Sequence, residues 1–445
     1  MPRKPPTEKP ELMFDPAKPP AIQRRRDSHG KETVIDMITQ VREYELITPL
    51  MGGGVKAGYV DLDLPIHAKA IRGHLRFWWR ATRGGQYPTI TKLREAEINL
   101  WGAASTPKAN HDSLVQLQIR VMNKGNNYVH PPDRDGKPIP LWHPSKSNYG
   151  YLAFPLKEKP DAQVLEKISF TLAVTHPKIT ETEINAALWA WETFGGIGAR
   201  TRRGFGALHL KSIRVDGRVI ALPALNDARK HIENGLKDHL VQNGNWPDGV
   251  PHLSYDSARY VVADGFDEPL AAWRHLIEEL KKFRQERSGK FGRSKWPEPD
   301  AIRHDTRHSP RHPPNPAVPR KFPRAEFGLP IIFQFKEDDV KDNDPEKTTL
   351  EGVNHNRLAS RVILRPMKLA NGKAVALAAV LEAPAAPPGG LALKIHESRF
   401  KDGTTAKVVN SSLTSGEAAR IQPLNGNPNV IEAFLRRLIG GRQTQ

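Results

Sequence analysis

The sequence predicts an α+β fold on two observations. Stretches in which apolar and polar residues alternate, as in half-buried strands, are interleaved with stretches whose apolar residues recur at helical spacing. Two long segments, 1–33 and 288–324, interrupt this pattern and are rich in proline and basic residues, so we expect no core element in either of them. With 445 residues the chain is long enough for two or three domains.

The elements of the first half follow one another in a recognisable order. Residues 1–33 are expected to form a disordered basic arm, and the regular pattern begins at residue 34. The elements that follow are a strand at 41–50, a helix at 67–83, strands at 114–122 and 167–176, a helix at 180–194 and a strand at 205–215. Thr180 and Glu183 have the spacing of a capping box at the start of the second helix. The order βαββαβ is that of a ferredoxin-like domain, a topology that RNA-recognition domains also use.

The second half, from residue 221, is less regular. Its clearest element is an amphipathic helix at 269–287. Strands are expected at 324–335, 360–369, 374–383 and 391–397, and a last helix at 429–439. Residues 288–324 contain only three acidic residues among many prolines, arginines and histidines, and we expect them to form a long loop.

The composition narrows the possible functions. Lys and Arg total 67 against 49 Asp and Glu, which gives a net charge of +18 and a pI near 9.9. Such an excess is typical of proteins that bind nucleic acid or anionic membranes. Cysteine is absent, which excludes disulfides, thiolate metal sites and a cysteine nucleophile. No apolar run approaches the ~18 residues that span a bilayer, and no secretory signal begins the chain, so a soluble cytoplasmic protein is expected.

The helix predicted at 67–83 carries a ridge of positive charge. At about 100° per residue its basic side chains fall within about 80° of arc; they are Lys69, Arg72, Arg76, Arg80 and Arg83. No acidic residue inside the stretch relieves their repulsion at i,i+4 spacing. The common interpretation of such a ridge is a solvated helix face, but five unpaired like charges favour a face that follows the phosphates of a nucleic acid.

Two glycine-rich loops in the same domain also carry basic residues. "PLMGGGVKAG" contributes Gly52, Gly53, Gly54 and Lys56, and "GIGARTRRGFG" contributes Gly198, Arg200, Thr201, Arg202, Arg203, Gly204 and Phe205. Glycine allows close approach to the backbone, whose N–H groups can face phosphate, and the arginine fork binds phosphate directly. The nucleotide-binding pattern GxxxxGK[ST] is absent. Trp79 and Phe205 could stack on bases, although burial in the core is the alternative for both.

No catalytic or metal-binding constellation is recognised. His304, His308 and His312 would share a face of a helix, but Pro310, Pro313 and Pro314 argue against a helix there. His29 could serve as a base in RNA cleavage only if the N-terminal arm is ordered. We therefore predict no catalytic residues, no metal and no cofactor.

Four stretches of the sequence resemble a known family. "ITPLMGGGVKAGYVDLDLPIHAKAIRGHLRFWWRATRGG" and "GIGARTRRGFG" resemble the RAMP superfamily (repeat-associated mysterious proteins). The first of them, together with "FPRAEFGLPIIFQF" and "LASRVILRPMKL", is similar to the family of first-numbered subunits of the Cmr, or type III-B, CRISPR effector module. The long arm and the insert at 288–324 depart from the family pattern.

The resemblance implies both fold and function. The fold would be two ferredoxin-like (RRM-like, βαββαβ) domains in tandem, 34–220 and 221–445, with long basic and proline-rich insertions. The chain would be a non-catalytic RNA-binding subunit that holds the 3′ region of a guide RNA and its target duplex and caps one end of the backbone filament. Its partners would be guide RNA, target RNA and the other Cmr subunits, with no membrane, and Lys321 and Arg324 would join the RNA-binding residues. A metal-independent RAMP endoribonuclease that processes guide precursors, or a general basic RNA-binding protein, are the alternatives.

Overall fold

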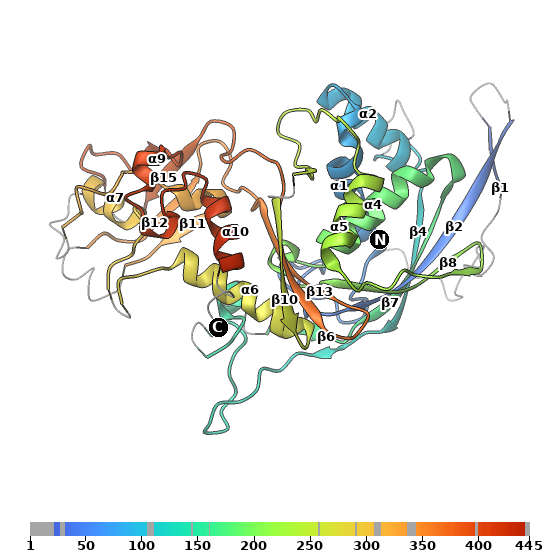
Figure 1. Ribbon diagram of the computed structural model, residues 1–445, viewed down its shortest axis with the longest axis horizontal. Helices are drawn as coiled ribbons and strands as arrows, with labels where there is room; N and C mark the ends of the chain where they lie inside the picture. Colours follow the sequence, from blue (N-terminus) through green and yellow to red (C-terminus); the bar gives the residue numbers. More distant parts are fainter. Residues whose placement is uncertain are drawn as a thin grey trace, which may run out of the picture.

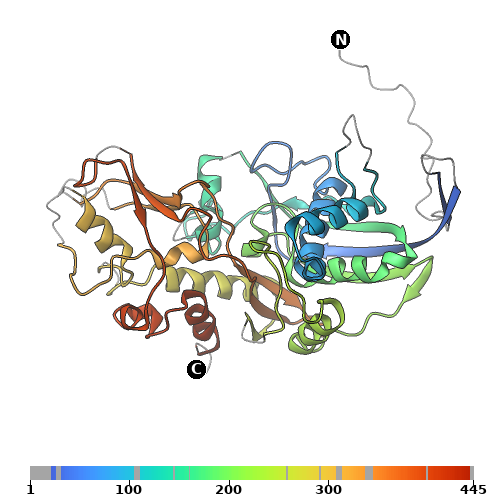
Figure 2. The same ribbon diagram turned by 90° about the horizontal axis from the view of Figure 1, so that it is seen from above.

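A computed structural model describes residues 22–26, 32–104, 111–143, 146–159, 161–256, 259–289, 292–306, 313–335, 344–396 and 399–440. The fold mixes helices with antiparallel sheets, as predicted. Figures 1 and 2 show a large sheet at one end, a four-stranded sheet at the other, and a three-stranded sheet between them. A small sheet in the order β3-β6-β5 lies below; its strands are β3 (Leu50–Met51), β5 (Asn126–Asn127) and β6 (Val164–Glu166).

The large sheet contains the predicted strands of the first half. Its strands are β1 (Ile22–Arg26), β2 (Glu32–Leu46), β4 (Gln116–Asn123), β7 (Ser169–Pro177), β8 (Leu208–Val215) and β9 (Arg218–Ile220). They lie in the order β4-β7-β2-β8-β9, with β1 paired to β2. Helix α1 (Ala68–Arg83) connects β2 to β4, and α4 (Glu181–Phe194) connects β7 to β8. This pairing agrees with the predicted βαββαβ order of the first half.

Several local predictions in the first half were wrong. The predicted disordered arm includes β1, which pairs with Glu32–Asp36 of β2; residues 1–21 and 27–31 of the arm, with His29, lie outside the described residues. Helix α2 (Ile90–Trp101), capped by the Thr89 side chain, was not predicted. The Thr180 capping box does not form, because its hydroxyl donates to the Pro177 carbonyl at 2.8 Å while Glu183 binds side chains of α1.

The central sheet is buried on both faces. Its strands β10 (Tyr260–Phe266), β14 (Ala374–Val380) and β13 (Val362–Lys368) are antiparallel in that order. Residues such as Ile363 and Leu377 share a core with α4 and with α5 (Ala228–His239). The alternate residues, such as Leu364 and Ala376, share another core with α6 (Pro269–Arg284) and α10 (Val430–Gly440). The two halves of the chain are thus packed together through this sheet.

The four-stranded sheet corrects the prediction for the second half. It consists of β11 (Ile331–Phe333), β12 (Thr348–Gly352), β15 (Leu391–Ile395) and β16 (Ala406–Val409), in that order. Strands predicted near 324–335 and 391–397 therefore leave the central sheet and pair with partners of their own. The central sheet has only three strands among the described residues, so a second complete ferredoxin-like domain is not confirmed. The structure also contains two short helices, α3 (Gly150–Ala153) and α9 (Ser415–Ala418).

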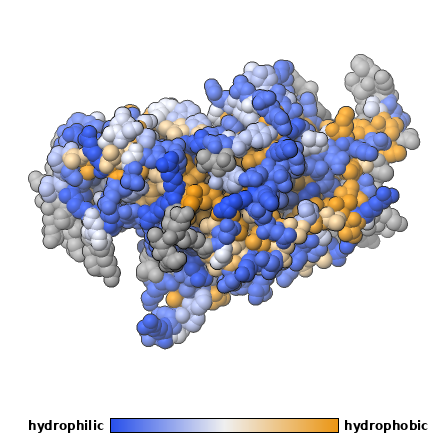
Figure 3. All heavy atoms as spheres, in the orientation of Figure 1, coloured by the Kyte–Doolittle hydropathy of each residue, from blue (hydrophilic) through white to orange (hydrophobic). Residues whose placement is uncertain are grey.

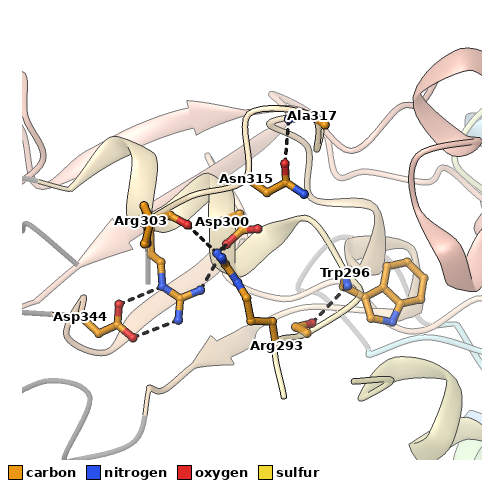
Figure 4. Close-up of polar contacts among 9 residues, drawn as sticks. Arg293, Trp296, Asp300, Arg303, Asn315, Ala317 and Asp344 are labelled. Atoms are coloured by element: carbon orange, nitrogen blue, oxygen red, sulfur yellow. Dashed lines mark hydrogen bonds and ion pairs between the residues drawn. The ribbon is translucent and has the colours of Figure 1, made fainter. Parts of the chain in front are cut away.

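The segment 288–324 is not simply a loop, which was the expectation. It contains α7 (Glu298–Asp305), and Trp296, Ile302 and Phe322 are buried. The Arg303 guanidinium binds both oxygens of buried Asp344, at 2.8 and 2.9 Å, while Asp300 binds Arg293 and Arg303 (Figure 4). Isolated apolar residues and one bidentate ion pair thus order a proline-rich stretch whose composition resembles a loop.

Only one of the three histidines of this segment, His304, lies among the described residues. His304 lies in the last turn of α7, which ends at Asp305, so this helix does not continue toward the other two histidines; His308, Pro310 and His312 fall outside the described residues. Among the residues that are described, no three His, Asp or Glu side chains gather in a way that could hold a metal ion. Within the same residues, no helix is long and apolar enough to cross a membrane.

Candidate nucleic-acid interface

The two glycine-rich loops lie against each other. The Ala199 amide donates to the Met51 carbonyl at 2.6 Å. A Cβ atom on Gly198 would lie 2.7 Å from the same carbonyl, and one on Gly53 would lie 3.1 Å from the Gly198 Cα. Gly52, Gly53 and Gly198 all have positive φ. Only glycine fits at these contacts, so the structure unites two loops that the sequence separates by more than a hundred residues.

The tip of the first loop is braced from one side. The Lys56 ammonium lies 3.9 Å from the centre of the Tyr59 ring, and that of Lys159 lies 5.5 Å from it. Lys159 also donates to the Ala57 carbonyl, and the Tyr59 hydroxyl donates to Asp161 at 2.8 Å. The brace leaves Lys56 exposed at the tip, next to Val55, which is 99% exposed.

The arginines of the second loop bind the other half of the chain. Arg202 and Arg203 belong to η4 (Thr201–Arg203), a single 3₁₀ turn, and Arg200 precedes this turn at φ +59°. Arg202 donates to the Ser360 carbonyl, and Arg203 donates to the carbonyls of Val362 and Phe327 at 3.0 and 2.8 Å. These hydrogen bonds attach the loop to the start of β13 and to the 3₁₀ turn that ends at Phe327.

A fourth guanidinium completes what we call the cation cluster, defined as Arg200, Arg202, Arg203 and Arg284. Arg284 ends α6 and donates to the Tyr151 hydroxyl at 3.0 Å. Burial, followed by the charge of Arg284, lowers the pKa of Arg203 to about 9, and burial lowers the pKa of Arg202 to about 10. Burial also lowers the pKa of Arg200.

Three members of the cation cluster have no carboxylate partner in the part of the chain that the structure describes. None of the described Asp or Glu side chains forms an ion pair with Arg200, Arg202 or Arg203. Arginine keeps its proton under ordinary conditions, so the lowered pKa values indicate that these charges are held in an unfavourable environment, mainly because of burial. An external anion at this place would relieve that energy, and guanidinium groups suit phosphate.

The predicted ridge of unpaired charges on α1 is wrong for three of its members. Arg76 and Arg80 both bind the Glu97 carboxylate of α2, Arg76 at 2.7 Å. Arg83 binds Glu183 of α4 at 2.9 Å. The acids come from other elements, which i,i+4 spacing within the helix cannot reveal. The remaining two members are Arg72, which donates to the Trp101 carbonyl at 3.3 Å, and Lys69, which is exposed.

Neither candidate stacking residue is available to a base. Trp79 is 1% exposed and donates its indole N–H to Glu183 at 2.6 Å. Phe205 is fully buried and lies edge-on to Trp273, with ring centres 4.8 Å apart. Both residues belong to the core, which corrects their assignment to RNA. Thr201 remains partly exposed and Gly204 is buried against Trp273.

The open face of the large sheet also lacks the aromatic residues of RNA-recognition domains. Tyr44 and Arg42 point toward α4, since both bind Glu192. The register then places Val41 and Glu43, with Thr171 and Arg120 of the neighbouring strands, on the opposite face. Along these stretches of β2, β7 and β4 no aromatic side chain faces outward, so base stacking on this sheet is not supported.

Two basic residues of the second half that were expected to bind RNA, Lys321 and Arg324, form contacts within the protein instead. The Arg324 Nε lies 3.1 Å from an oxygen of buried Glu298, and its Nη1 donates to the Arg284 carbonyl at 2.8 Å. Lys321 lies 3.9 Å from Glu417. Arg324 therefore supports the end of α6, where Arg284 stands, and does not itself face outward.

The fold adds residues that the sequence did not single out. Tyr59 and Lys159 brace the first loop, Arg284 joins the cation cluster, and Phe154 lies beside Arg200. Each of the missed residues is single in an irregular segment or at a helix end, so no periodic pattern marked it; only the packing of distant segments does.

Residues 43–209 match the sequence model of the RAMP superfamily. The match begins near the end of β2, ends at the start of β8 and includes both glycine-rich loops. The first half of the chain therefore contains a RAMP-superfamily domain.

One similar protein is a subunit of a Cmr system. Over 195 residues, 40% of this chain, the sequence is 26% identical to "CRISPR system Cmr subunit Cmr1-2" of Pyrococcus furiosus, of which 98% is covered. This match confirms the resemblance to Cmr subunits. The apo crystal structure of Cmr1 from Pyrococcus furiosus is similar at 15% identity and a TM-score of 0.47, over 82% of this chain and 94% of that chain. A chain of a type III-B Cmr-beta complex bound to cognate target RNA is similar at 11% identity and a TM-score of 0.47, over 89% and 99%.

Proposed function

We propose that this protein is a non-catalytic RNA-binding subunit of a type III-B CRISPR effector complex in the cytoplasm. It would hold the 3′ region of the guide RNA and its target duplex, and would cap one end of the filament of backbone subunits. The observation that carries the proposal is the cation cluster, whose loop arginines pair with none of the described carboxylates, set at two packed glycine-rich loops in a RAMP domain. The similarity to a Cmr subunit supports the type of complex.

The geometry divides the work between the arginines. Arg202 and Arg203 donate to backbone carbonyls of the second half and hold the loop in place. Arg200 has no carboxylate partner among the described residues and is only partly buried, so its guanidinium is the one offered to phosphate. Exposed Lys56 at the braced tip adds a second charge nearby. Contacts of this kind bind the RNA backbone and carry no sequence information.

The proposal also requires protein partners. Exposed apolar side chains occur at the far end of the large sheet, among them Ile22, Val34 and Val219. Figure 3 shows apolar surface gathered over this end, where β1 and β2 lie. Apolar surface away from the cation cluster is what contact with a neighbouring subunit would use.

Two experiments separate this function from its alternatives. The full chain is expressed with and without sister Cmr subunits and a CRISPR array, and RNA that co-purifies is analysed. We expect guide RNA and sister subunits to be recovered together; ribosomal or mixed RNA without those subunits would contradict the proposal. End-labelled guide precursor incubated with the chain should stay intact on a denaturing gel. Metal-independent cleavage that His67→Ala abolishes would make the chain a nuclease; His67 lies 3.3 Å from Asp61, close after the first glycine-rich loop.

A further inference from the structure

Phe154 is an exposed aromatic residue at the cation cluster. It begins η2 (Phe154–Glu158), directly after α3, and is 55% exposed. Tyr151, three residues earlier on the same short helical stretch, binds Arg284. Residues three apart share one side of a helix, so this stretch presents both rings to the arginines.

Arg200 covers part of the Phe154 ring. Its guanidinium carbon lies 4.9 Å from the ring centre, within cation–π range. Arg200 is held at φ +59°, a conformation that non-glycine residues seldom adopt, by the turn in which the Arg203 amide donates to its carbonyl at 2.8 Å. The pair is thus placed by backbone geometry, and the exposed part of the ring remains free for another flat group.

A second donor near the pair is also unsatisfied. The Arg284 Nε is buried and has no hydrogen-bond partner among the described residues. Its guanidinium already lies 5.6 Å from the centre of the Phe327 ring and donates to Tyr151 through Nη1. A flat apolar ring, a guanidinium stacked on it and a second guanidinium close by are the parts of a nucleotide site: the ring takes the base and the cations take the phosphate.

We propose that Phe154 stacks on an unpaired base of the bound RNA while Arg200 and Arg284 bind the phosphate beside it. The inference rests on the proposed RNA-binding function and adds a substrate class to it. A duplex hides its bases, so a stacking ring selects a single-stranded or splayed nucleotide over a fully paired one. This chain would then bind the guide RNA partly where it is not paired to target.

The test compares single-stranded and duplex RNA. Fluorescence anisotropy measures the affinity of the full chain for labelled oligouridine and for a blunt RNA duplex of the same length. Phe154→Leu keeps an apolar side chain but removes the ring, and Phe154→Tyr restores a ring. Loss of one base–aromatic stack corresponds to about a 10-fold weaker affinity. We expect that loss for Phe154→Leu with oligouridine only, with Phe154→Tyr close to the wild type. Ile179→Ala, at an exposed residue before α4, is the control for loss of exposed apolar surface.

The outcomes distinguish the two proposals. A 2-aminopurine placed in the oligonucleotide should be quenched by wild type and Phe154→Tyr but not by Phe154→Leu. If Arg200→Gln and Arg284→Gln weaken both RNAs while Phe154→Leu binds oligouridine as the wild type does, the stacking inference is overturned and the RNA-binding function stands. If the arginine variants bind both RNAs normally, the interface itself is refuted, and the stacking site with it.

Discussion

The indole N–H of Trp273 donates a hydrogen bond to the carbonyl oxygen of Arg203 at 2.7 Å. Trp273 lies on α6, in the second half of the chain, and is fully buried. Tyr149 stacks on its ring at 4.6 Å, and the next residue of the loop, Gly204, packs against its indole nitrogen. The conformation of the glycine-rich loop therefore depends on the second half, and an isolated first domain would present the arginines differently.

Gly204→Ala should destabilise the protein through contact with Trp273. A Cβ atom there would overlap the indole nitrogen, and Gly204 also has φ +87°. Overpacking costs about 1–3 kcal/mol, and the left-handed conformation costs a further ~1–2 kcal/mol. Gly217→Ala is the matched control, because Gly217 has φ +81° but nothing within 4 Å of the added atom. Urea unfolding should give a clearly larger loss for Gly204→Ala; equal losses would show that the packing against Trp273 is unimportant.

Arg365→Leu should also weaken folding. This buried arginine of β13 donates to the carbonyls of Glu192 and Gly195 at the end of α4, and to that of Leu208, at 2.7, 2.8 and 2.7 Å. Burial lowers the pKa of Arg365 to about 9, yet the negative end of the α4 dipole favours the cation.

Removing the Arg365 guanidinium leaves three buried carbonyls without it, at about 1–3 kcal/mol each. We expect a loss of at least ~3 kcal/mol in the free energy of unfolding, against almost none for Arg214→Leu on the exposed surface of β8. Wild-type stability of Arg365→Leu in chemical denaturation would refute this role.

Stability should fall on mild acidification because of a partly buried histidine. Burial lowers the pKa of His74 to about 4, against an unfolded value near 6.5. Between these values the unfolded chain binds a proton that the folded chain does not, so folding stability decreases as pH falls from 6.5 toward 4. The slope is at most about 1.4 kcal/mol per pH unit for one group. His74→Gln should flatten this part of the pH–stability curve; an unchanged slope would place the titration elsewhere.

The ion pairs of α1 predict which arginines matter for RNA. Arg80 binds the nearly buried Glu97 together with Arg76, so Arg80→Ala should cost about 1–3 kcal/mol of stability. Its effect on RNA affinity should be smaller than that of Arg200→Ala, which breaks no described ion pair. Filter binding and thermal melting on the same preparations test this. A larger affinity loss for Arg80→Ala would restore the basic ridge of α1 as the phosphate-binding face.

The sequence predicted five elements of the first half because their patterns are periodic and local, whereas α2 and β1 were not predicted. α1, β4, β7, α4 and β8 all have boundaries close to the expected ones. The sequence pattern did not reveal ion pairs between residues that are far apart along the chain. Glu97 and Glu183 neutralise the ridge on α1 from other elements, and the burial of Trp79 follows from the same packing.

The second half was harder to predict for a physical reason. Strands β13 and β14 are buried on both faces, so their continuous apolar sequences carry no face preference and do not identify their neighbours. In 288–324, Trp296 and Ile302 anchor a helix amid prolines. Both glycine-rich loops were singled out from the sequence by their glycines and basic residues, and the structure brings them into contact. Phe154 and Arg284 were recognised only from the three-dimensional structure.

The salt dependence of RNA binding by the Arg200→Gln variant tests the central claim most directly. The affinity of the full chain for guide RNA is measured at several salt concentrations, with Arg218→Gln, an exposed arginine of β9, as the control. If Arg200 binds phosphate, the variant should bind more weakly at every salt concentration, and the slope of log affinity against log salt should fall by about 1 relative to wild type and Arg218→Gln. An Arg200→Gln variant with wild-type affinity and slope would contradict the account.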